Sequence, residues 1–270
     1  MKIMSFNANG LRARISQLKS IISNHEPDII GLQETKVSNE EFPVKDIQEL
    51  GYDVIFHGQK GHYGVALLYR LPIINSDKGF PHDNNENQKR LITGEFNFQN
   101  KKISILNGYF PQGESRSHNK KFPYKQKFYS DLADHLAFKY NPNDLLLVMG
   151  DMNVAPVDLD IGIGDENKKR WLRTGKCCFL PEEREWLQRL EKWGLTDTYQ
   201  HFHPKEIDRY SWFDYRSRGF EMEPKRGLRI DLILTSKSLT NMISSVGIDH
   251  TARGMDKPSD HCPVWISLKT

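Results

Sequence analysis

The sequence predicts an α/β sandwich, in which β-sheets are covered by helices. Nine short runs rich in Ile, Val, Leu and Phe are typical of buried strands, and two longer stretches repeat apolar residues with the period of an amphipathic helix. Strands that outnumber helices indicate sheets with helices packed outside them. A hydrophobic fraction of 37% and a charged fraction of 27% are typical of a globular chain and exclude a disordered one.

The expected elements follow one another along the chain without a linker rich in Pro, Gly or Ser, so we expect one domain over 1–270. The helix at 182–193 has Pro181 at its first position and Gly194 after its end, as is usual for helix ends. The segment 156–181 has no clean period and is expected to be a long loop with some helix, a common place for a binding element. The other helices are expected at 12–24 and 125–140, and the strands at 2–6, 28–33, 52–56, 65–69, 91–96, 103–107, 145–149, 230–235 and 264–268.

The composition limits the compartment and the partners. The net charge is only +3, but Lys and Arg cluster at 168–176 and 216–229, which is common where a protein binds a polyanion; charge alone favours a solvated basic face. The three cysteines, two of them adjacent, form neither a disulfide framework nor a zinc-binding pair. There is no signal-peptide pattern and no apolar run long enough for a membrane. We therefore expect a soluble cytoplasmic protein that has no membrane partner and is a monomer.

Acidic and amide residues stand at the ends of several expected strands. If these strands lie side by side, their ends bring the polar side chains together in one pocket. Oxygen ligands of this kind suit a hard cation, and Mg²⁺ is the natural candidate because it takes one or two carboxylates together with water and phosphate. Such a cation polarises a phosphoryl oxygen. The residues concerned are Asn7, Glu34, Asp151, Asn153, Asp231, Asp260 and His261.

Each of these residues also has an ordinary structural interpretation. A Glu after a strand, such as Glu34, is usually exposed or a helix cap, and 150–153 and 259–261 are normal turn sequences. Asp231 is different, because a carboxylate between Ile and Leu residues is costly to bury without a partner. The joint occurrence of these residues indicates a functional site.

Seven sequence strings follow one another along the chain: 31–36 (GLQETK), 58–66 (GQKGHYGVA), 107–111 (NGYFP), 150–153 (GDMN), 170–176 (RWLRTGK), 227–231 (GLRID) and 259–261 (SDH). Together they resemble the bacterial exonuclease III family of the endonuclease/exonuclease/phosphatase superfamily. The resemblance spans nearly the whole chain. It implies a deoxyribonuclease-I-like fold, a four-layer α/β sandwich with two mixed β-sheets packed face to face and helices outside. It implies a 3′→5′ exonuclease on duplex DNA, an endonuclease cutting 5′ to abasic sites, and removal of 3′-blocking groups including phosphate.

The resemblance also implies roles for residues at the matching positions. Glu34 would be the main ligand of Mg²⁺, with Mn²⁺ as the alternative. Asp151 would prepare the attacking water, although a rival mechanism makes His261 the base, and the residues alone leave both open. Asp231 would orient His261, as an acid orients an imidazole in hydrolytic triads. The full implied sets are Asn7, Glu34, Asp151, Asn153, Asp260 and His261 for the metal, with Asp260 acting directly, through water or at a second metal, and Tyr109, Asp151, Asn153, Asp231 and His261 for catalysis.

The expected partner is double-stranded DNA with abasic sites or 3′-blocked ends. Trp212 and Phe213 precede Arg216 and Arg218, and aromatic residues beside cations suit unstacked nucleotides, although a place in the core is the simpler interpretation of the two rings. The resemblance places Trp212, Phe213 and Leu228 around a pocket for a base-free sugar. It places Arg90 and Gln112 near the DNA backbone.

Three other functions remain open at this point. A phosphatase of the same fold could act on inositol phosphates or sphingomyelin, because fold does not determine substrate. A DNA-binding module without catalysis would have kept the scaffold alone, and the presence of Glu34, Asp151, Asn153 and His261 argues against it. Metal-free hydrolysis by Ser259 would use the adjacent Asp260 and His261, but the chain lacks the G-x-S-x-G turn of such enzymes.

Overall fold

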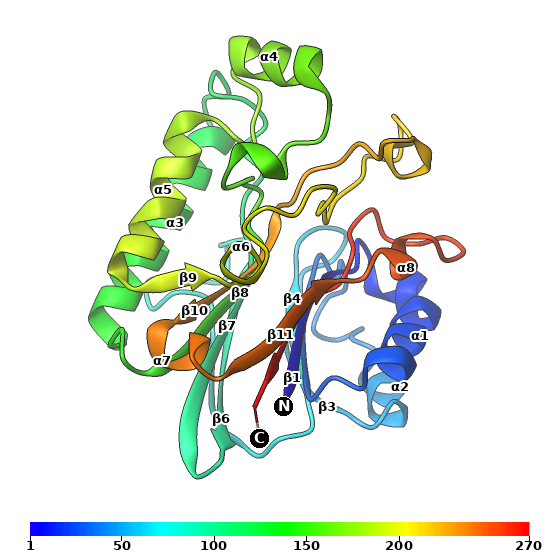
Figure 1. The fold of residues 1–270 in the computed structure, drawn as a ribbon. Coiled ribbons are helices and arrows are strands. Elements are labelled where there is room, and N and C mark those ends of the chain that lie inside the picture. Colours follow the sequence, from blue (N-terminus) through cyan, green and yellow to red (C-terminus); the bar gives the residue numbers. More distant parts are fainter. Residues whose placement is uncertain (270) are drawn as a thin grey trace.

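Two six-stranded sheets form the centre of the computed structural model, which describes residues 1–269 (Figure 1). Only the β1–β2 and β7–β8 pairs are parallel, so both sheets are mixed. The first sheet has the order β11 (Ile243–Ile248), β12 (Val264–Leu268), β1 (Lys2–Asn7), β2 (Ile29–Gln33), β4 (Val65–Tyr69) and β3 (Asp53–His57). The second has the order β5 (Ile73–Lys78), β6 (Leu91–Phe98), β7 (Lys101–Tyr109), β8 (Leu145–Asp151), β10 (Asp231–Ser236) and β9 (Leu195–Asp197).

Helices cover the outer faces of both sheets. The pair α1 (Ile15–His25) and α2 (Val44–Glu49) packs on the first sheet, and α3 (Lys121–Lys139) and α5 (Pro181–Trp193) pack on the second (Figure 1). This arrangement confirms the predicted four-layer sandwich with two mixed sheets between helices. The shorter helices are η1 (Leu11–Arg14), η2 (Asp158–Asp160), α4 (Asp165–Thr174), α6 (Thr198–Phe202), η3 (Gly219–Glu221), α7 (Lys237–Thr240) and α8 (His250–Arg253). Among the described residues, no helix combines the length and the apolar character that a membrane span requires.

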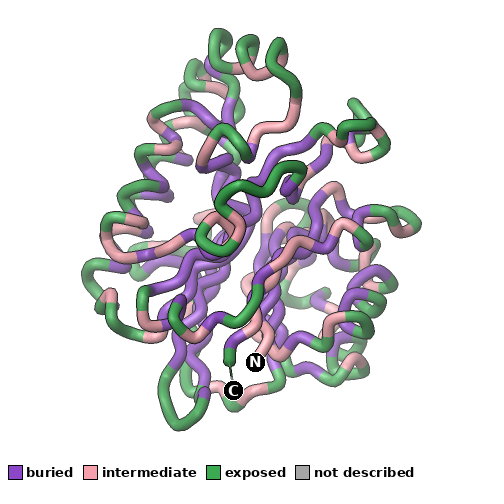
Figure 2. Tube along the Cα trace, in the orientation of Figure 1, coloured by how far each residue is buried: buried purple, intermediate pink, exposed green. Residues whose placement is uncertain are grey.

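The alternation of side chains along each strand divides the core into layers. In β1, Ile3 points between the sheets, while Met4 and Phe6 point toward α1. In β8, Leu147 and Met149 point between the sheets. The inner strands of both sheets are accordingly buried in the centre of the molecule, and exposed residues concentrate on the helices, loops and sheet edges (Figure 2).

The layer between the sheets changes from apolar to polar toward one end. Along β1, Ile3 is followed on the same face by Ser5 and Asn7, because successive side chains of a strand alternate between its two faces. The side chain of Gln33, on β2, donates to Asn107 Oδ1 at 2.6 Å and to Ser5 Oγ at 3.0 Å, which joins the two sheets. On β8, the same alternation places Asp151, the last residue of the strand, on the face that carries Leu147 and Met149. A polar site therefore lies at this end of the layer between the sheets.

All nine expected strands are present, and the structure adds three more. The added strands are β5, β9 and β11, whose sequences lack a run of large apolar residues: β5 is mostly exposed, and β9 has only three residues. The segment 156–181 contains η2 and the whole of helix α4. No residue of α4 is buried, so the sequence of this helix lacks the apolar stripe by which a core-facing helix is predicted. Helix α3 begins at Lys121, four residues before the predicted start, because Pro123 is accommodated in its first turn.

Candidate active site

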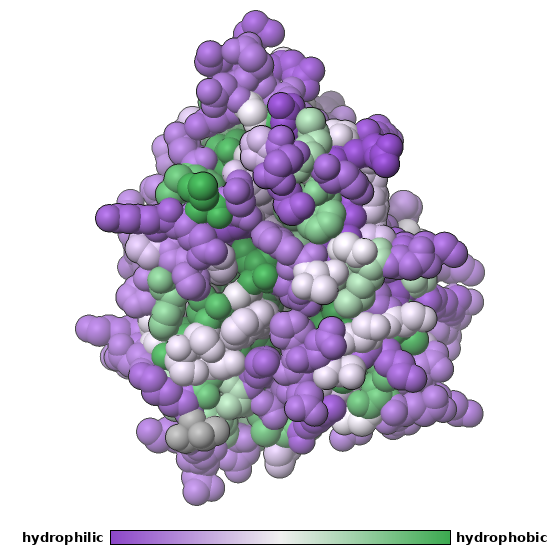
Figure 3. Space-filling model, turned by 45° about the vertical axis from the view of Figure 1, so that its right-hand side comes forward, coloured by the Kyte–Doolittle hydropathy of each residue, from purple (hydrophilic) through white to green (hydrophobic). Residues whose placement is uncertain are grey.

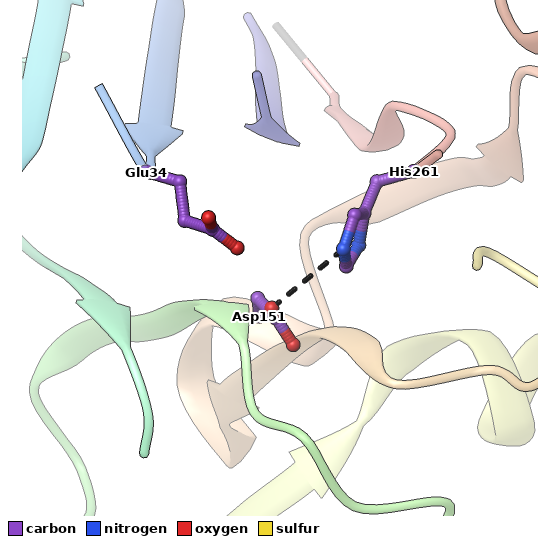
Figure 4. A group of neighbouring side chains, drawn as sticks. All are labelled: Glu34, Asp151 and His261. Atoms are coloured by element: carbon purple, nitrogen blue, oxygen red, sulfur yellow. Dashed lines mark ion pairs between the residues drawn. The ribbon is translucent and has the colours of Figure 1, made fainter. Parts of the chain in front are cut away.

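Three side chains from different elements meet at the polar end of the layer. Glu34 directly follows β2, Asp151 is the last residue of β8, and His261 precedes β12 (Figure 4). One possible ligand atom from each lies within 4.8 Å of the others. The Nε2 atom of His261 is 3.8 Å from Oδ2 of Asp151. Residues that are far apart in the sequence are thus brought together by the packing of one sheet on the other.

His261 is held in orientation by a buried carboxylate. Its Nδ1 atom lies 2.9 and 3.0 Å from the two carboxylate oxygens of Asp231, and Ser211 Oγ donates to Asp231 Oδ2 at 2.7 Å. In the register of the second sheet, Asp231 pairs with Asp151, which pairs in turn with Tyr109. Because Nδ1–H is donated to Asp231, Nε2 is the atom that faces the cavity.

Burial and charge act in opposite directions on the ionisable groups here. Burial lowers the pKa of His261, but the carboxylates of Asp231 and Asp151 outweigh burial and raise this pKa well above the ordinary value. Burial raises the pKa of Asp151, and the neighbouring His261 only partly offsets this. Burial, Glu34 and Asp151 raise the pKa of Tyr109. The site therefore holds more buried negative charge than its own cations neutralise.

Asn7 links the two carboxylates of the site. Its Nδ2 atom donates to Glu34 Oε1 and to Asp151 Oδ2, each at 3.0 Å, while its Oδ1 accepts from the backbone N–H of Asn9. The structure thus brings Asn7 to the predicted position but turns its N–H groups, not its oxygen, toward the carboxylates. In this arrangement Asn7 orients the two carboxylates.

The donor set fits a hard divalent cation. Glu34 and Asp151 offer carboxylate oxygens that face the same cavity, and such oxygens are the ligands that Mg²⁺ prefers. The raised pKa of Asp151 has burial as its main cause, and a nearby cation would favour the ionised form. Lys36 Nζ, 3.1 Å from Glu34 Oε2, supplies part of the missing positive charge.

Asn153 is fixed by its backbone as well as by its side chain. It adopts a left-handed conformation with φ of 53°, and its Nδ2 donates to the carbonyl oxygen of Phe110 at 3.0 Å. The buried Lys125 donates from Nζ to the carbonyl oxygens of Asn153 and Gln112, at 2.8 and 3.2 Å, and to Glu183 Oε1 at 2.5 Å. Lys125 therefore ties the loop after β8 to the loop after β7.

A cavity of about 590 Å³ opens over these side chains. One wall is apolar and the rim is basic. Figure 3 shows a mostly hydrophilic surface, including the projecting end that carries α4, with hydrophobic residues in small separate areas. The apolar wall consists of Ile163, Trp212, Met222, Leu228 and Ile230, and the cations of the rim are Arg170, Lys176, Arg216 and Arg226.

Most of the predicted site residues line this cavity, but two predicted DNA contacts do not. Phe213 is fully buried and packs edge-on against Phe220 and His250, so it does not line the cavity as Trp212 does, because neighbours in an extended segment point to opposite sides. Arg90 is 7% exposed, stacks on Tyr63 and Tyr109 at 4.2 and 4.6 Å, and donates to the carbonyl oxygen of Tyr109 at 2.9 Å. Arg90 thus braces Tyr109. The predicted residues that line the cavity are Glu34, Tyr109, Gln112, Asp151, Asn153, Trp212, Leu228, Asp260 and His261.

Ser259 does not act as a hydrolytic nucleophile. Its Oγ donates to the carbonyl oxygen of Asn7 at 2.7 Å and accepts from the backbone N–H of His261 at 3.2 Å. The hydroxyl is fully buried and outside the lining of the cavity. This overturns the interpretation of metal-free serine hydrolysis.

Four residues of the site were missed at the level of sequence. They are Asn9, Lys36, Lys125 and Ser211, which orient other side chains and do not belong to the cluster of possible ligands. Asn9 and Lys36 each stand two residues after a predicted ligand, so proximity in the sequence could have pointed to them. Nothing local distinguishes Lys125 from the other lysines of α3.

Comparison with known proteins places this architecture in one family. The chain belongs to the endonuclease/exonuclease/phosphatase family, whose model matches residues 4–261, and it is therefore an enzyme of a nuclease and phosphatase family. It is 54% identical over 269 residues to exodeoxyribonuclease III of Haemophilus influenzae, with 100% of both chains covered. A 3′ phosphatase from Neisseria bound to a product DNA hairpin matches with a TM-score of 0.89 and 32% identity, and an AP endonuclease from Archaeoglobus fulgidus with 0.90 and 30%, each over 100% of both chains.

Proposed function

We propose that this chain is a Mg²⁺-dependent phosphodiesterase of duplex DNA with the activities of exodeoxyribonuclease III. These are 3′→5′ exonuclease activity, incision 5′ to abasic sites and removal of 3′-blocking groups including phosphate, with Mn²⁺ as an alternative cation. The observation that carries the proposal is the cluster of Glu34, Asp151 and His261 at the base of a cavity with an apolar wall and a basic rim. The 54% identity with the Haemophilus enzyme over the full length supports the same reaction. We further propose a monomer that works in the cytoplasm.

The two carboxylates of Glu34 and Asp151 are suited to hold the cation, and Asn7 keeps them in place. When bound, the cation would polarise a phosphoryl oxygen and stabilise negative charge on the leaving oxygen. Asn153 and Tyr109 line the same cavity and are suited to hold the scissile phosphate or the attacking water.

The contacts of His261 favour Asp151 over His261 as the base. Nδ1 of His261 lies against the buried carboxylate of Asp231, whose charge favours the protonated imidazole, so Nε2 is suited to donate to a phosphate oxygen. Burial raises the pKa of Asp151, and a cation bound beside it would favour its ionised form. Asp151 in its ionised form would take a proton from water as the water oxygen bonds to phosphorus. The bond from phosphorus to the 3′ oxygen then breaks, and this oxygen takes up a proton from solvent.

The cavity has the chemistry to receive DNA that contains a base-free sugar. Trp212 and Leu228 supply an apolar wall near the catalytic groups, and a flipped sugar without a base would fit against this wall, where a normal base would be crowded out. Arg170, Arg216 and Arg226 on the rim are suited to phosphates. Gln112 lines the cavity and is exposed, which suits it for a contact with the backbone of the DNA.

A labelled duplex with one abasic-site analogue tests this proposal. Purified protein is mixed with the duplex in Mg²⁺, in Mn²⁺ or in excess chelator, and the products are separated by length. Incision just 5′ of the lesion is expected only with a divalent cation. A Glu34→Ala variant is expected to need more Mg²⁺ for half-maximal incision, because it loses one of the two carboxylates.

Two results would count against the proposal. Incision in excess chelator would show that the reaction does not need a divalent cation. The absence of incision with every cation would show that abasic DNA is not a substrate. In the second case a phosphoinositide becomes the next substrate to test, since the fold alone also suits a phosphatase of that kind.

A further inference from the structure

Asp260 connects the apolar wall of the cavity to the cation-binding side. Its Oδ2 atom accepts the indole N–H of Trp212 at 2.9 Å, and its Oδ1 atom accepts Nδ2 of Asn9 at 2.8 Å. Asn9 Oδ1 in turn accepts from Lys36, whose Nζ is 3.1 Å from Glu34 Oε2. Both carboxylate oxygens of Asp260 are therefore engaged by protein donors. Its carboxylate does not belong to the cluster of possible ligands found among the described residues.

The backbone around Trp212 is fixed, whereas its ring is held by one polar contact. The backbone N–H groups of Trp212 and Leu228 each donate to the other's carbonyl oxygen, at 2.9 and 3.0 Å. The backbone N–H of Phe213 donates to the carbonyl oxygen of Asp260 at 2.9 Å. These bonds determine where the Trp212 side chain starts but not where its ring points. Indole has a single polar atom, a donor, so the bond to Asp260 selects the ring orientation.

This bond is of the strong kind. A donor that meets an ionised carboxylate forms a shorter and stronger hydrogen bond than one between neutral groups. The ring is half-buried at the wall of the cavity, which leaves room for other rotamers if the bond is lost. Beside it, Leu228 is buried and completes the apolar surface. The shape of the wall thus depends on a carboxylate that itself stands outside the wall.

We propose that Asp260 is a specificity-determining positioning residue, which holds the Trp212 indole in the orientation that favours a compact base-free sugar over a normal nucleotide. The inference rests on the proposed function, because it concerns the substrate of the same site. Asp260 acts through Trp212 and not as a ligand of the cation. The alternative role of a metal ligand makes different predictions and is tested in the same experiment.

The test is a double-mutant cycle of Asp260→Ala and Trp212→Phe. Phe keeps an aromatic ring in the wall but removes the N–H donor. The quantity measured is the ratio of kcat/KM for an abasic duplex to kcat/KM for exonuclease action on an intact duplex. Each single variant is expected to lower this ratio by about tenfold, which is the effect of one charge-assisted hydrogen bond. The double variant is expected to lose no more than either single variant.

The Mg²⁺ requirement of the variants tests the alternative, in which Asp260 is a metal ligand. The Mg²⁺ concentration for half-maximal incision is expected to stay within about twofold of that of the parent in Asp260→Ala, since the residue is not a ligand. A marked rise in that concentration would overturn the proposal, and so would a double variant whose loss is the product of the two single losses. Asp260→Asn is expected to recover most of the ratio, because its amide oxygen still accepts from the indole N–H.

A spectroscopic measurement separates this inference from the proposed function. The indole N–H resonance of Trp212, assigned by its disappearance in Trp212→Phe, is recorded in cation-free protein without DNA. Asp260→Ala is expected to shift this resonance, and an unchanged resonance would overturn the positioning role. If the parent protein cuts no DNA, the proposed function fails while the resonance still reports whether Asp260 holds the ring.

Discussion

The floor and the rim of the cavity are built in different ways. The floor of the cavity, which we define as Asp151, Asn153, Asp231 and His261, is at most 4% exposed. These residues lie at or just after the end of β8, at the start of β10 and before β12, and their side chains have buried partners, such as the carbonyl oxygen of Phe110 for Asn153. The rim carries Arg170 and Lys176, in and after α4, on one side and Arg216 and Arg226, in the segment 214–226, on the other, and none of the residues of α4 is buried (Figure 2). Both parts of the rim project from the same end of the molecule (Figure 1).

This difference indicates that the floor controls the rate of the reaction and that the rim controls the affinity for DNA. In the floor of the cavity, strand register and buried hydrogen bonds fix the positions of the side chains, so a substitution there should change the rate of the chemical step. In the rim, exposed cations act over a longer distance and are screened by salt, so a substitution there should change affinity.

The largest effect is expected for Asp151→Asn, which keeps the shape of the side chain but removes its ability to take a proton. The single-turnover rate on abasic duplex should fall by about 10³-fold or more, while DNA binding in chelator stays within a few-fold of the parent. A rate near that of the parent would refute the role of Asp151 as the general base that takes a proton from water.

A smaller loss, of about 10²-fold in kcat, is expected for Asp231→Asn. The imidazole of His261 keeps its place but loses the charge that orients it and raises its pKa. The matched control is Asp256→Asn, which changes an exposed carboxylate. Equal rates for the two variants would show that His261 does not depend on Asp231.

An intermediate effect is expected for the buried ion pair of Lys125 and Glu183. Lys125→Met leaves Glu183 buried without its partner, which should cost about 3–5 kcal/mol in the free energy of unfolding. The double variant Lys125→Met/Glu183→Gln removes both charges and keeps the acceptor for the backbone N–H of Leu180, so it should regain much of this stability. It should still be about tenfold slower, because the carbonyl oxygen of Asn153 has lost its donor.

Glu183→Gln alone is the control, since Lys125 remains beside Asn153. Rates are measured well below the melting temperature of each variant, so that unfolding does not enter. If the double variant is as fast as Glu183→Gln, the ion pair supports the fold and not the site.

The smallest effect is expected at the rim. Arg170→Ala and Arg226→Ala should each weaken binding of duplex DNA by a few-fold, and each should lower the slope of log K against log salt by about 1. The change in kcat should be smaller than the change in affinity. A slope equal to that of the parent would show that these side chains do not meet phosphate.

The sequence predicted nine of the twelve strands because each combines a short apolar run with nearby turn residues. It did not predict β9 and β11, since their pairing is decided by the strands that lie beside them. Trp212 and Phe213 show the same limit within the site: adjacent residues point to opposite sides, and the local sequence does not say which side is the cavity. The extent of the domain, 1–270, stays a prediction.

The sequence by itself determined that Asn7 and Asp151 continue the faces of their strands that carry Ile3 and Met149, because side chains alternate along a strand. It thereby determined that polar groups end the apolar layer between the sheets. Only the tertiary structure decided which partner each group finds. Asn9 meets Asp260 across 251 residues, and Asn7 meets Asp151 across 144, because sheet packing and loop conformation, rather than local propensity, set those distances.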